Sequence, residues 1–393
     1  MSKADRITIQ ATVGGTPVEL VTRPGFPGWD ALTQAEALLA AYAEVAAGQR
    51  VLVYPGGHGA LAVWLAKESE AGAVLAADTN CVAVGCAEAT AARNGVGDRV
   101  RLSLGLPAQA GSELDVILLR VPKGRDLARL LFLEAFAALR PGGSLYLAGA
   151  NREGIKSVAA DCAALFGEGA LLGYKGGNRV LLYTRPEALP EPLPPEYTLP
   201  GVARGTWHEF PVTAGQATLT IRTRPGVFSW RGLDAGSGAL LDVLAGEGMV
   251  RATDEVLDVG CGAGIIGLYA ATRARQGQVT MVDVDWLATE SARASVALNG
   301  LGNCAVRLGD GVPAGERAYT LIVSNPPFHS GHATSLAAAE SFIREARGAL
   351  RPGGRLLVVA NRFLPYDRLM AAEFGQAEAL VNTKRYWVLA ARR

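Results

Sequence analysis

The stretch from Ser324 to His329 combines an amide, two prolines and an aromatic ring, and it follows an apolar run at residues 319–323. Such a run is typical of a buried parallel strand, and the two prolines end its pairing. They also stiffen the backbone where Asn325 and Phe328 project. A rigid amide acceptor beside a flat ring suits a planar amine held in place for chemistry, although a strand that merely ends at a Pro-Pro turn would give the same residues.

Glycines and carboxylates recur at the ends of the preceding apolar runs. Glycines let the backbone turn sharply and approach a ligand closely, and a carboxylate on the strand before them can receive a cationic group. A glycine loop alone would equally suit a dinucleotide, so the acids and the later Asn-Pro-Pro-Phe stretch are needed to distinguish the ligand. These residues are Asp258, Gly260, Gly262, Gly264, Asp283 and Asp310.

Strand and helix patterns alternate through the C-terminal half, which predicts a parallel sheet with helices on both faces. Asn299-Gly300 is a helix C-terminal signal, and two alternating runs at 207–212 and 217–224 predict a hairpin ahead of the domain. The expected strands are 256–259, 279–283, one ending at 310, 319–323 and 355–360. Three helices are expected: one begins at 265, one ends at about 298, and one covers about 335–350.

The N-terminal half repeats this plan at an offset of 205 residues. Asp78 precedes Asp283 by that distance, and Asn94-Gly95 precedes Asn299-Gly300. A constant offset across several elements predicts an internal duplication of one α/β domain. A proline-rich segment at 186–200 is expected to be a stiff linker, with the first domain at 1–185 and the second at 201–393.

The two copies differ where chemistry would need specific groups, while their apolar periodicity is the same. Asp78 is the exception, and we interpret it as a helix N-cap. The first copy is therefore expected to be structural or to face RNA rather than to be catalytic. The pairs, second copy first, are Asp258 and Val53, Gly260 and Pro55, Asp310 and Gly105, Asn325 and Arg120, and Phe328 and Lys123.

The composition excludes some classes of protein. The hydrophobic content of 49% is ample for two cores, and a net charge of +1 gives no global electrostatic footprint for nucleic acid. We find no apolar run of about 18 residues and no signal-peptide core. The five cysteines form no CxxC pair, so neither a zinc site nor a disulfide framework is indicated, and a cytoplasmic protein is expected.

The order of glycine loop, acid after the second strand, acid after the third and Asn-Pro-Pro-Phe after the fourth resembles the class I S-adenosylmethionine-dependent N-methyltransferases. The resemblance covers residues 225–393 with all motifs and about 20–185 as a degenerate copy. The duplicated layout with Asn-Pro-Pro-Phe-His is similar to the bacterial guanine-N2 methyltransferases of ribosomal RNA, and most of all to those of guanosine 1207 in 16S rRNA. This resemblance implies two tandem Rossmann-like domains, each with a mostly parallel seven-stranded sheet.

The resemblance also implies roles for residues. S-adenosylmethionine would be bound by the glycine loop, with Asp258 near its amino group, Asp283 at the ribose hydroxyls and Asp310 with Gly311 at the adenine. The amine would be held by Asn325, and the base would be flipped out to stack on Phe328. The catalytic set is Asn325, Pro326, Pro327 and Phe328. The cofactor set adds Cys261 to the loop and three acids named above and also includes Asn325. The substrate set is Phe228, Ser237, Phe328 and His329.

Several alternatives remain open at this stage. The amine could belong to a guanosine of the large subunit, to adenine N6 or to a protein glutamine, or the chain could be a ribosome-assembly factor without activity. Asp285 is expected to be a helix N-cap. His329 and His332 lack an apparent third ligand, so no metal is expected. We expect a monomer without membrane contact that acts on 16S rRNA of the small subunit, and scattered arginines could meet phosphates. These basic residues are Arg222, Arg224, Arg231, Arg362, Lys384 and Arg385.

Overall fold

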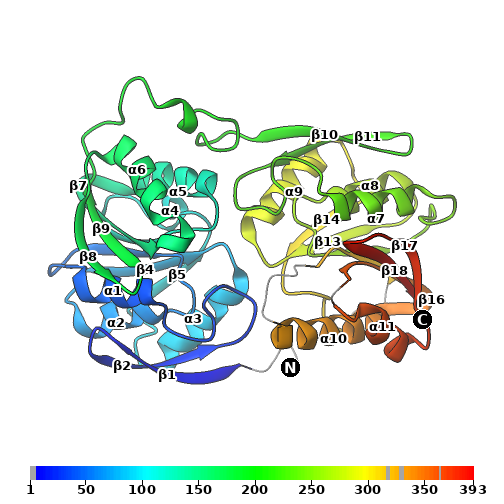
Figure 1. Cartoon of the computed structure of the whole chain (residues 1–393), viewed down its shortest axis with the longest axis horizontal. Coiled ribbons are helices and arrows are strands. Elements are labelled where there is room, and N and C mark those ends of the chain that lie inside the picture. The colour runs from blue at the N-terminus through cyan, green and yellow to red at the C-terminus, as the bar shows by residue number, and fades with distance from the viewer. Residues whose placement is uncertain (1–5, 316–318, 327–331, 363) are drawn as a thin grey trace. The chain divides into compact units, whose positions relative to one another are not determined.

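A computed structural model describes residues 6–315, 319–326, 332–362 and 364–393 of the chain. They form two compact units, an N-terminal unit of residues 6–206 and a C-terminal unit of residues 207–393 (Figure 1). Each unit is an α/β domain built around one seven-stranded sheet, as the alternation of strand and helix patterns predicts. None of the helices in the described part of the chain is long and apolar enough to cross a membrane.

The C-terminal unit begins with a hairpin and continues as an alternating α/β domain. Its elements are β10 (His208–Ala214), β11 (Ala217–Thr223), α7 (Ala235–Ala245), β12 (Val256–Val259), α8 (Ile265–Arg273), β13 (Val279–Asp283), α9 (Trp286–Leu298), β14 (Cys304–Leu308), β15 (Tyr319–Ser324), α10 (His332–Ala349), β16 (Leu350–Asn361), α11 (Tyr366–Phe374), β17 (Glu378–Asn382) and β18 (Tyr386–Arg392).

The N-terminal unit has the same plan. Its elements are β1 (Ile7–Val13), β2 (Thr16–Thr22), α1 (Gln34–Tyr42), β3 (Arg50–Tyr54), α2 (Ala60–Glu68), β4 (Ala73–Asp78), α3 (Cys81–Arg93), β5 (Val100–Leu104), α4 (Pro107–Ala110), β6 (Leu114–Arg120), α5 (Arg125–Ala138), β7 (Leu139–Ala150), η1 (Asn151–Glu153), α6 (Ile155–Phe166), β8 (Ala170–Lys175), β9 (Asn178–Thr184) and η2 (Pro195–Tyr197).

Both sheets have the same strand order. It is β14-β13-β12-β15-β16-β18-β17 in the C-terminal unit and β5-β4-β3-β6-β7-β9-β8 in the N-terminal unit. The first five strands in each order run parallel, and the last two pair antiparallel. The carboxyl ends of β12, β13, β14 and β15 therefore meet at one edge of the C-terminal sheet, as ligand sites of open α/β sheets require.

Helices cover both faces of the C-terminal sheet, with α10 and α11 on one side and α7, α8 and α9 on the other (Figure 1). On the α10 side, Ile343 and Met370 pack against Ile322 and Leu356 of the central strands, and all four side chains are buried. Because both faces are covered, the central strands carry continuous apolar runs instead of alternating ones.

Most predicted boundaries in the C-terminal half are confirmed. The helix ending at Leu298, the strands over 256–259 and 279–283 and the hairpin have the expected ranges within about two residues. Strand β14 ends at Leu308, before the predicted end at Asp310, because its partner β13 ends at Asp283, which pairs with Leu308.

The proline-rich segment, predicted to be a stiff linker between the two domains, is part of the N-terminal unit. Residues 186–206 belong to the N-terminal unit, and the division lies between Thr206 and Trp207. Tyr197 in η2 is fully buried, and its hydroxyl donates to the Asp161 carbonyl. A buried aromatic anchor in the middle of this stretch holds it on the domain, and the polar, proline-rich composition around Tyr197 gave no sign of that contact.

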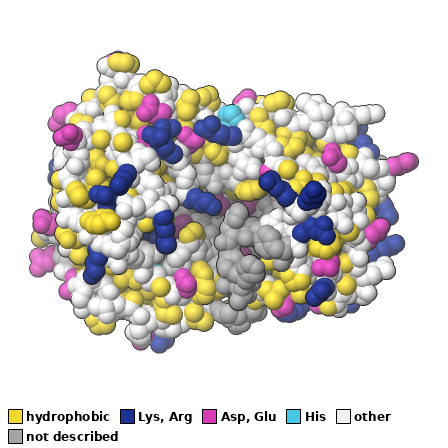
Figure 2. Space-filling view, in the orientation of Figure 1, with side chains coloured by type: hydrophobic (Ala, Val, Ile, Leu, Met, Phe, Trp, Pro, Cys, Tyr) yellow, Lys and Arg dark blue, Asp and Glu magenta, His cyan; other side chains and the backbone are white. Residues whose placement is uncertain are grey.

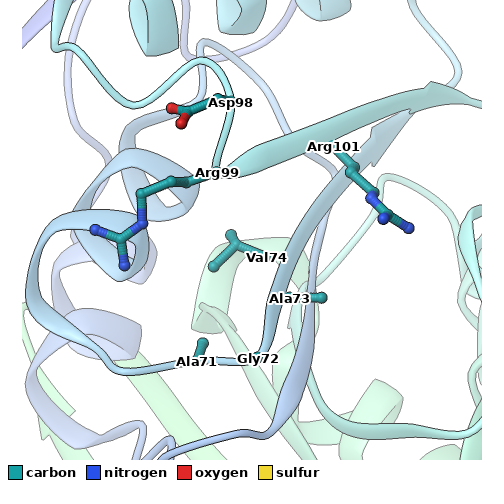
Figure 3. A pocket seen from close by; sticks show the side chains of 7 residues that line it. All are labelled: Ala71, Gly72, Ala73, Val74, Asp98, Arg99 and Arg101. Carbon is teal, nitrogen blue, oxygen red and sulfur yellow. The ribbon is translucent and has the colours of Figure 1, made fainter.

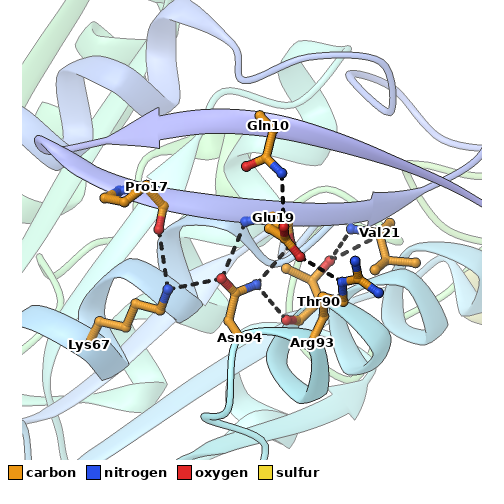
Figure 4. Close-up of polar contacts among 8 residues, drawn as sticks. All are labelled: Gln10, Pro17, Glu19, Val21, Lys67, Thr90, Arg93 and Asn94. Carbon is orange, nitrogen blue, oxygen red and sulfur yellow. Dashed lines mark hydrogen bonds and ion pairs between the residues drawn. The ribbon is translucent and has the colours of Figure 1, made fainter.

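In each unit, two polar side chains of one helix form hydrogen bonds with the backbone of the hairpin. In the N-terminal unit, Asn94 donates to the Glu19 carbonyl at 2.8 Å and accepts from the Glu19 N–H at 3.3 Å (Figure 4). In the C-terminal unit, Asn299 makes the same two bonds with Thr220, at 2.7 and 3.0 Å. These bonds satisfy backbone groups of β2 and β11 that no third strand pairs.

The second side chain of each pair lies one helical turn earlier. Thr90 accepts from the Val21 N–H at 2.9 Å and donates to its carbonyl at 3.2 Å (Figure 4). Ser295 makes the corresponding bonds with Arg222, at 2.9 and 3.1 Å. Positions 90 and 295 and positions 94 and 299 are both separated by 205 residues, as predicted. The hairpin residues that they bond are separated by 201, so the same hydrogen bonds recur although the offset is four residues shorter in the hairpin.

Candidate functional site

The glycine loop connects β12 to α8 at the carboxyl edge of the C-terminal sheet. Gly260, Gly262 and Gly264 all have positive φ, at 71°, 56° and 84°, a region that side chains disfavour. A Cβ on Gly260 or Gly262 would meet no described heavy atom within 4 Å, whereas one on Gly264 would lie 2.9 Å from Leu268. Gly264 is thus needed for packing of the helix, and the other two border open space.

Asp258 lies on β12 and is almost completely buried. Its Oδ2 accepts from the Gly267 N–H at 2.8 Å, one of the first-turn donors of α8 that have no partner within the helix. No ion pair to Asp258 occurs among the described residues. Burial raises the pKa of Asp258 to about 7, the Gly267 bond opposes the rise, and the charge of Asp283 adds to it. The site therefore contains a buried acid without a cationic partner.

Asp283 ends β13 beside the loop. Its Oδ2 accepts from the Gly262 N–H at 2.9 Å, and its Oδ1 accepts from the Asp285 N–H at 2.9 Å. Burial raises its pKa, and these backbone bonds partly offset the rise. Asp285 accepts from the Ala288 N–H at 3.1 Å, which confirms the predicted N-cap of α9. Asp283 thus fixes the loop and still has lone pairs for a ligand.

Asp310 lies in the loop after β14, where a small pocket opens. The pocket has a volume of about 270 Å³ and is lined by Val282, Leu308, Asp310, Gly311 and Val312 among others. Val282 comes from the neighbouring strand β13, so the pocket adjoins Asp283. The structure thus brings the third predicted acid next to the second, through the parallel pairing of β13 and β14.

Asn325 follows β15, whose last residue Ser324 donates from Oγ to the Val259 carbonyl at 2.7 Å. The Asn325 Nδ2 donates to Ser237 Oγ at 2.9 Å and to Asp234 Oδ1 at 3.4 Å. A carboxylate can only accept, so this contact requires the amide nitrogen to face Asp234 and directs the amide oxygen away from it. Asp234 caps α7, which therefore positions the amide.

The structure brings Asp258, Asp283, the glycine loop and Asn325 together at one sheet edge. Ser237, predicted as a substrate contact, accepts a hydrogen bond from Asn325, and its contact with substrate stays a prediction. The Cys261 side chain is buried with its Sγ toward the Gly262 carbonyl at 3.7 Å. Phe228 is 61% exposed on the loop before α7. Three predicted site residues lie outside the described residues: Pro327, Phe328 and His329.

Basic side chains are dispersed over the surface in Figure 2 and form no single patch on that face. Of the predicted phosphate contacts, Arg222 forms an ion pair with Glu209 at 2.7 Å. Arg224, Arg231 and Arg362 stack on tryptophan rings, at 4.2, 4.9 and 5.3 Å from the ring centroids. These arginines thus have partners within the C-terminal unit.

The matching edge of the N-terminal unit is filled by side chains. Arg120, at the position of Asn325, forms an ion pair with the buried Glu36 at 3.8 Å. A Cβ on Gly57, the counterpart of Gly262, would lie 3.2 Å from Arg120 Nη2. The buried ring of His58 lies beside Phe26, with its Nε2 3.3 Å from the Ala31 carbonyl. Charged and aromatic groups thus occupy the space that is open in the C-terminal unit.

Asp78 makes the same bonds as Asp283. Its Oδ2 accepts from the Gly57 N–H at 3.0 Å and its Oδ1 from the Asn80 N–H at 3.0 Å. The helix N-cap itself is Asn80, which accepts from Val82 and Ala83, so the prediction of Asp78 as the cap is wrong by two residues. An acid at this position holds the glycine turn in both units.

A second pocket, also of about 270 Å³, lies in the N-terminal unit where β4 and β5 begin (Figure 3). Residues 71–74 and the side chains of Asp98, Arg99 and Arg101 line it. It lies at the amino ends of these strands, whereas the predicted site residues gather at the carboxyl ends of theirs. The pocket at Arg101 thus lies at the amino edge of its sheet, and the pocket at Asp310 lies at the carboxyl edge of its own.

Comparisons with known proteins agree with this geometry. Residues 218–390 match the family model described as methyltransferase small domain, and residues 47–171 match its N-terminal domain model. The ribosomal RNA small subunit methyltransferase C of Salmonella choleraesuis is 34% identical over 300 residues, covering 75% of this chain and 80% of that protein. The Klebsiella pneumoniae protein of that name is 35% identical over 293 residues, with the same coverage.

A solved structure shares the whole architecture. The Thermus thermophilus 16S rRNA N2 G1207 methyltransferase, in complex with AdoMet and guanosine, superposes with a TM-score of 0.79 at 29% identity over 98% of both chains. The similarity covers both units, including the N-terminal unit without the open glycine loop. This chain therefore belongs to the ribosomal RNA small subunit methyltransferase C family.

Proposed function

We propose that the chain transfers a methyl group from S-adenosylmethionine to the exocyclic N2 of guanosine 1207 in 16S rRNA. The observation that carries this proposal is the position of Asn325. Its Nδ2 is bonded to Ser237 and Asp234, which leaves its oxygen to accept from an amine at the carboxyl edge of the sheet. The relatives, which are named as ribosomal RNA small subunit methyltransferases, and the Thermus enzyme, which is named as a 16S rRNA N2 G1207 methyltransferase, support the choice of substrate.

The residues at this edge fit S-adenosylmethionine. The open space at Gly260 and Gly262 allows a ligand to approach the backbone, and the buried Asp258 lacks a cationic partner among the described residues. We assign the amino group of the cofactor to Asp258, the ribose hydroxyls to Asp283 and the adenine to Asp310 with Gly311. Gly264 and Cys261 support the loop. When bound, the cofactor supplies an electrophilic methyl group.

The chain's own contribution is to orient the amine. The N2 lone pair of guanine is conjugated with the ring, so the nitrogen must be pulled toward tetrahedral geometry before it can attack. Asn325 Oδ1 and the Pro326 carbonyl would each accept one N–H, and Phe328 would stack on the base. No base is needed before attack, because the amine becomes cationic and loses its proton afterwards. Such positioning is worth up to ~7–11 kcal/mol in well-oriented systems.

We infer that the two units arose by duplication and that only the second is catalytic. Identical strand orders, the matched hairpin bonds and the shared bonds of Asp78 and Asp283 support the duplication. Arg120 and Glu36 fill the N-terminal counterpart of the cofactor site, which supports one cofactor per chain. Residues 1–185 and 201–393 remain our proposed non-catalytic and catalytic domains. We further propose a cytoplasmic monomer acting on the small subunit.

The test is transfer of labelled methyl from S-adenosylmethionine to naked 16S rRNA, small subunits and large subunits that lack the modification. We expect label in 16S rRNA as N2-methylguanosine at position 1207, mapped by mass spectrometry, and none with the Asn325→Ala variant. Label in large-subunit rRNA, on adenine or on protein would overturn the substrate assignment. No transfer to any of these acceptors would overturn the activity.

A further inference from the structure

An exposed aromatic and basic cluster lies at the corner of the N-terminal sheet where β7, β9 and β8 meet. Tyr174 on the edge strand β8 is 58% exposed, and Leu171 on the same strand is 52% exposed. Soluble proteins usually keep large apolar groups off an unpaired edge strand, because such an edge invites association. An exposed ring there therefore suggests a contact surface.

The ring is held in a defined arrangement by its neighbours. Arg179 of β9 pairs with Tyr174 in the hairpin register, and its guanidinium lies 4.9 Å from the ring centroid. Asn151 accepts from Arg179 Nε at 3.2 Å and donates to the Tyr174 hydroxyl at 3.5 Å. An arginine stacked on a tyrosine and fixed by an amide loses little side-chain entropy on binding.

The charge of the corner favours an anionic partner. Arg152 and Lys175 are exposed and directly follow Asn151 and Tyr174 in the chain, Arg179 is half-buried, and the acid of this segment, Glu153, accepts from the Ala150 N–H at 3.0 Å. Three cations and one acid leave a local excess of positive charge, although the chain as a whole is nearly neutral. Aromatic rings beside phosphate-binding cations are the typical composition of single-stranded nucleic acid sites.

The C-terminal unit has a related arrangement at the same corner of its own sheet. There Arg362, just after β16, stacks on Trp387 of β18 at 5.3 Å and donates to the Thr383 carbonyl, while Lys384 and Arg385 are exposed. Both units thus have an arginine stacked on an aromatic ring at this corner, although the two stacks are formed by residues of different strands, and the open glycine loop is found in the C-terminal unit.

We propose that the corner formed by Asn151, Arg152, Tyr174, Lys175 and Arg179 binds a single-stranded segment of the RNA substrate, with a base against Tyr174 and phosphates at the cations. The proposal rests on the proposed function in one respect, because it takes RNA as the substrate. It gives the non-catalytic unit a role in holding the substrate, and that role can be measured without any methyl transfer.

The test measures the Kd of the purified full-length chain for a 16S rRNA fragment, over a series of salt concentrations. Tyr174→Ala is expected to weaken binding on the order of tenfold, because stacking on one ring is lost. Tyr174→Phe keeps the ring and should bind within about twofold of the wild type. Arg179→Gln is expected to weaken binding and to reduce the slope of log K against log salt by roughly 1.

Arg101→Gln is the matched control, because Arg101 is an exposed arginine on β5, the opposite edge strand of the same sheet (Figure 3). It should leave both the Kd and the salt slope unchanged. All variants should bind S-adenosylmethionine like the wild type and melt at the same temperature. Wild-type binding by Tyr174→Ala, or equal weakening by Tyr174→Phe and Tyr174→Ala, would overturn the proposal. A wild-type chain that methylates no rRNA would instead contradict the proposed function.

Discussion

Asn325 Nδ2 donates to Ser237 Oγ at 2.9 Å, and the N-terminal unit has an ion pair between Arg120 and Glu36 at the matching positions. In the first pair a neutral hydroxyl holds an amide so that its oxygen faces the sheet edge. In the second, two opposite charges 3.8 Å apart form an ion pair and occupy that space. The residue pair that links β15 to α7 in one unit and β6 to α1 in the other thus distinguishes the open carboxyl edge of the C-terminal sheet from the filled edge of the N-terminal sheet.

Replacing Asn325 by Ala should reduce methyl transfer at least ~100-fold, because an acceptor used in the chemical step is lost. The affinity for S-adenosylmethionine should change by less than about threefold, since the assigned cofactor contacts lie on other residues. Single-turnover transfer and equilibrium cofactor binding measure the two effects. Near-normal turnover in this variant would contradict the assignment of the amine site.

Ser237→Ala tests whether positioning of the amide matters. The variant keeps Asn325 but removes the nearer of the two acceptors of its Nδ2, so we expect kcat to fall about 5- to 20-fold with little change in KM. Ser237→Thr retains the hydroxyl and should restore most of the rate. Equal losses in the Ala and Thr variants would indicate a packing role for Ser237 and not a hydrogen-bonding one.

The stability of the cofactor-free C-terminal unit should depend on Asp258. Its folded pKa of about 7 exceeds the unfolded value of about 3.9, so the folded state holds the extra proton between these limits. The contribution of Asp258 to stability should therefore be fully present below about pH 4 and fall by a few kcal/mol as pH rises from about 4 to 7. Hydrogen exchange of β12 amides between pH 4 and 8, corrected for intrinsic rates, measures this locally.

Asp258→Asn should flatten that pH dependence, because the neutral amide does not titrate. Asp242→Asn, on the exposed face of α7, is the control and should leave it unchanged. A cationic ligand group favours the charged carboxylate, which forms as pH rises. In the wild type, cofactor affinity should therefore increase with rising pH, by up to about tenfold per unit, until pH reaches about 7. An affinity independent of pH would argue against Asp258 as the partner of the amino group.

Arg120→Ala should destabilise the N-terminal unit by about 3 kcal/mol, because it leaves the carboxylate of Glu36 buried and without its ion pair. Burial alone would raise the pKa of Glu36, but Arg120, His58 and Thr33 together lower it. The paired replacement Arg120→Asn with Glu36→Ser should cost less than Arg120→Ala alone. Denaturant unfolding of these two variants and of Arg120→Asn and Glu36→Ser alone provides the comparison, and a cost of the double replacement that equals the sum of its two single costs would contradict the coupling.

The hydrogen bonds of Asn94 to β2 and of Asn299 to β11, here called the hairpin clamps, allow a matched comparison between the two units. Asn94→Ala and Asn299→Ala each leave backbone groups of β2 or β11 without their partners, at a cost of about 1–3 kcal/mol. Each change should increase hydrogen exchange in the hairpin of its own unit and not in that of the other. Loss of protection in both hairpins from one substitution would show that the clamps are not local.

The sequence by itself determined the α/β class, the repeated plan and most of the central strands. These features depend on local patterns, because buried parallel strands are continuous apolar runs and helix ends carry Asn-Gly signals, as at Asn299. The retained acid at Asp78 and the changed residue at Arg120 were also visible from the constant offset. The offset thus allowed one half of the chain to be used as a control for the other.

Only the tertiary structure decided which side chains meet. The contact of Ser237 with Asn325 joins residues 88 positions apart, and that of Arg120 with Glu36 joins residues 84 apart, so no periodicity predicts either. The burial of Tyr197, which fixes the proline-rich segment on its domain, likewise depends on a surface formed by distant elements. Patterns along the chain report local conformation and burial, whereas the environment of a polar side chain depends on how the strands are ordered in the sheet.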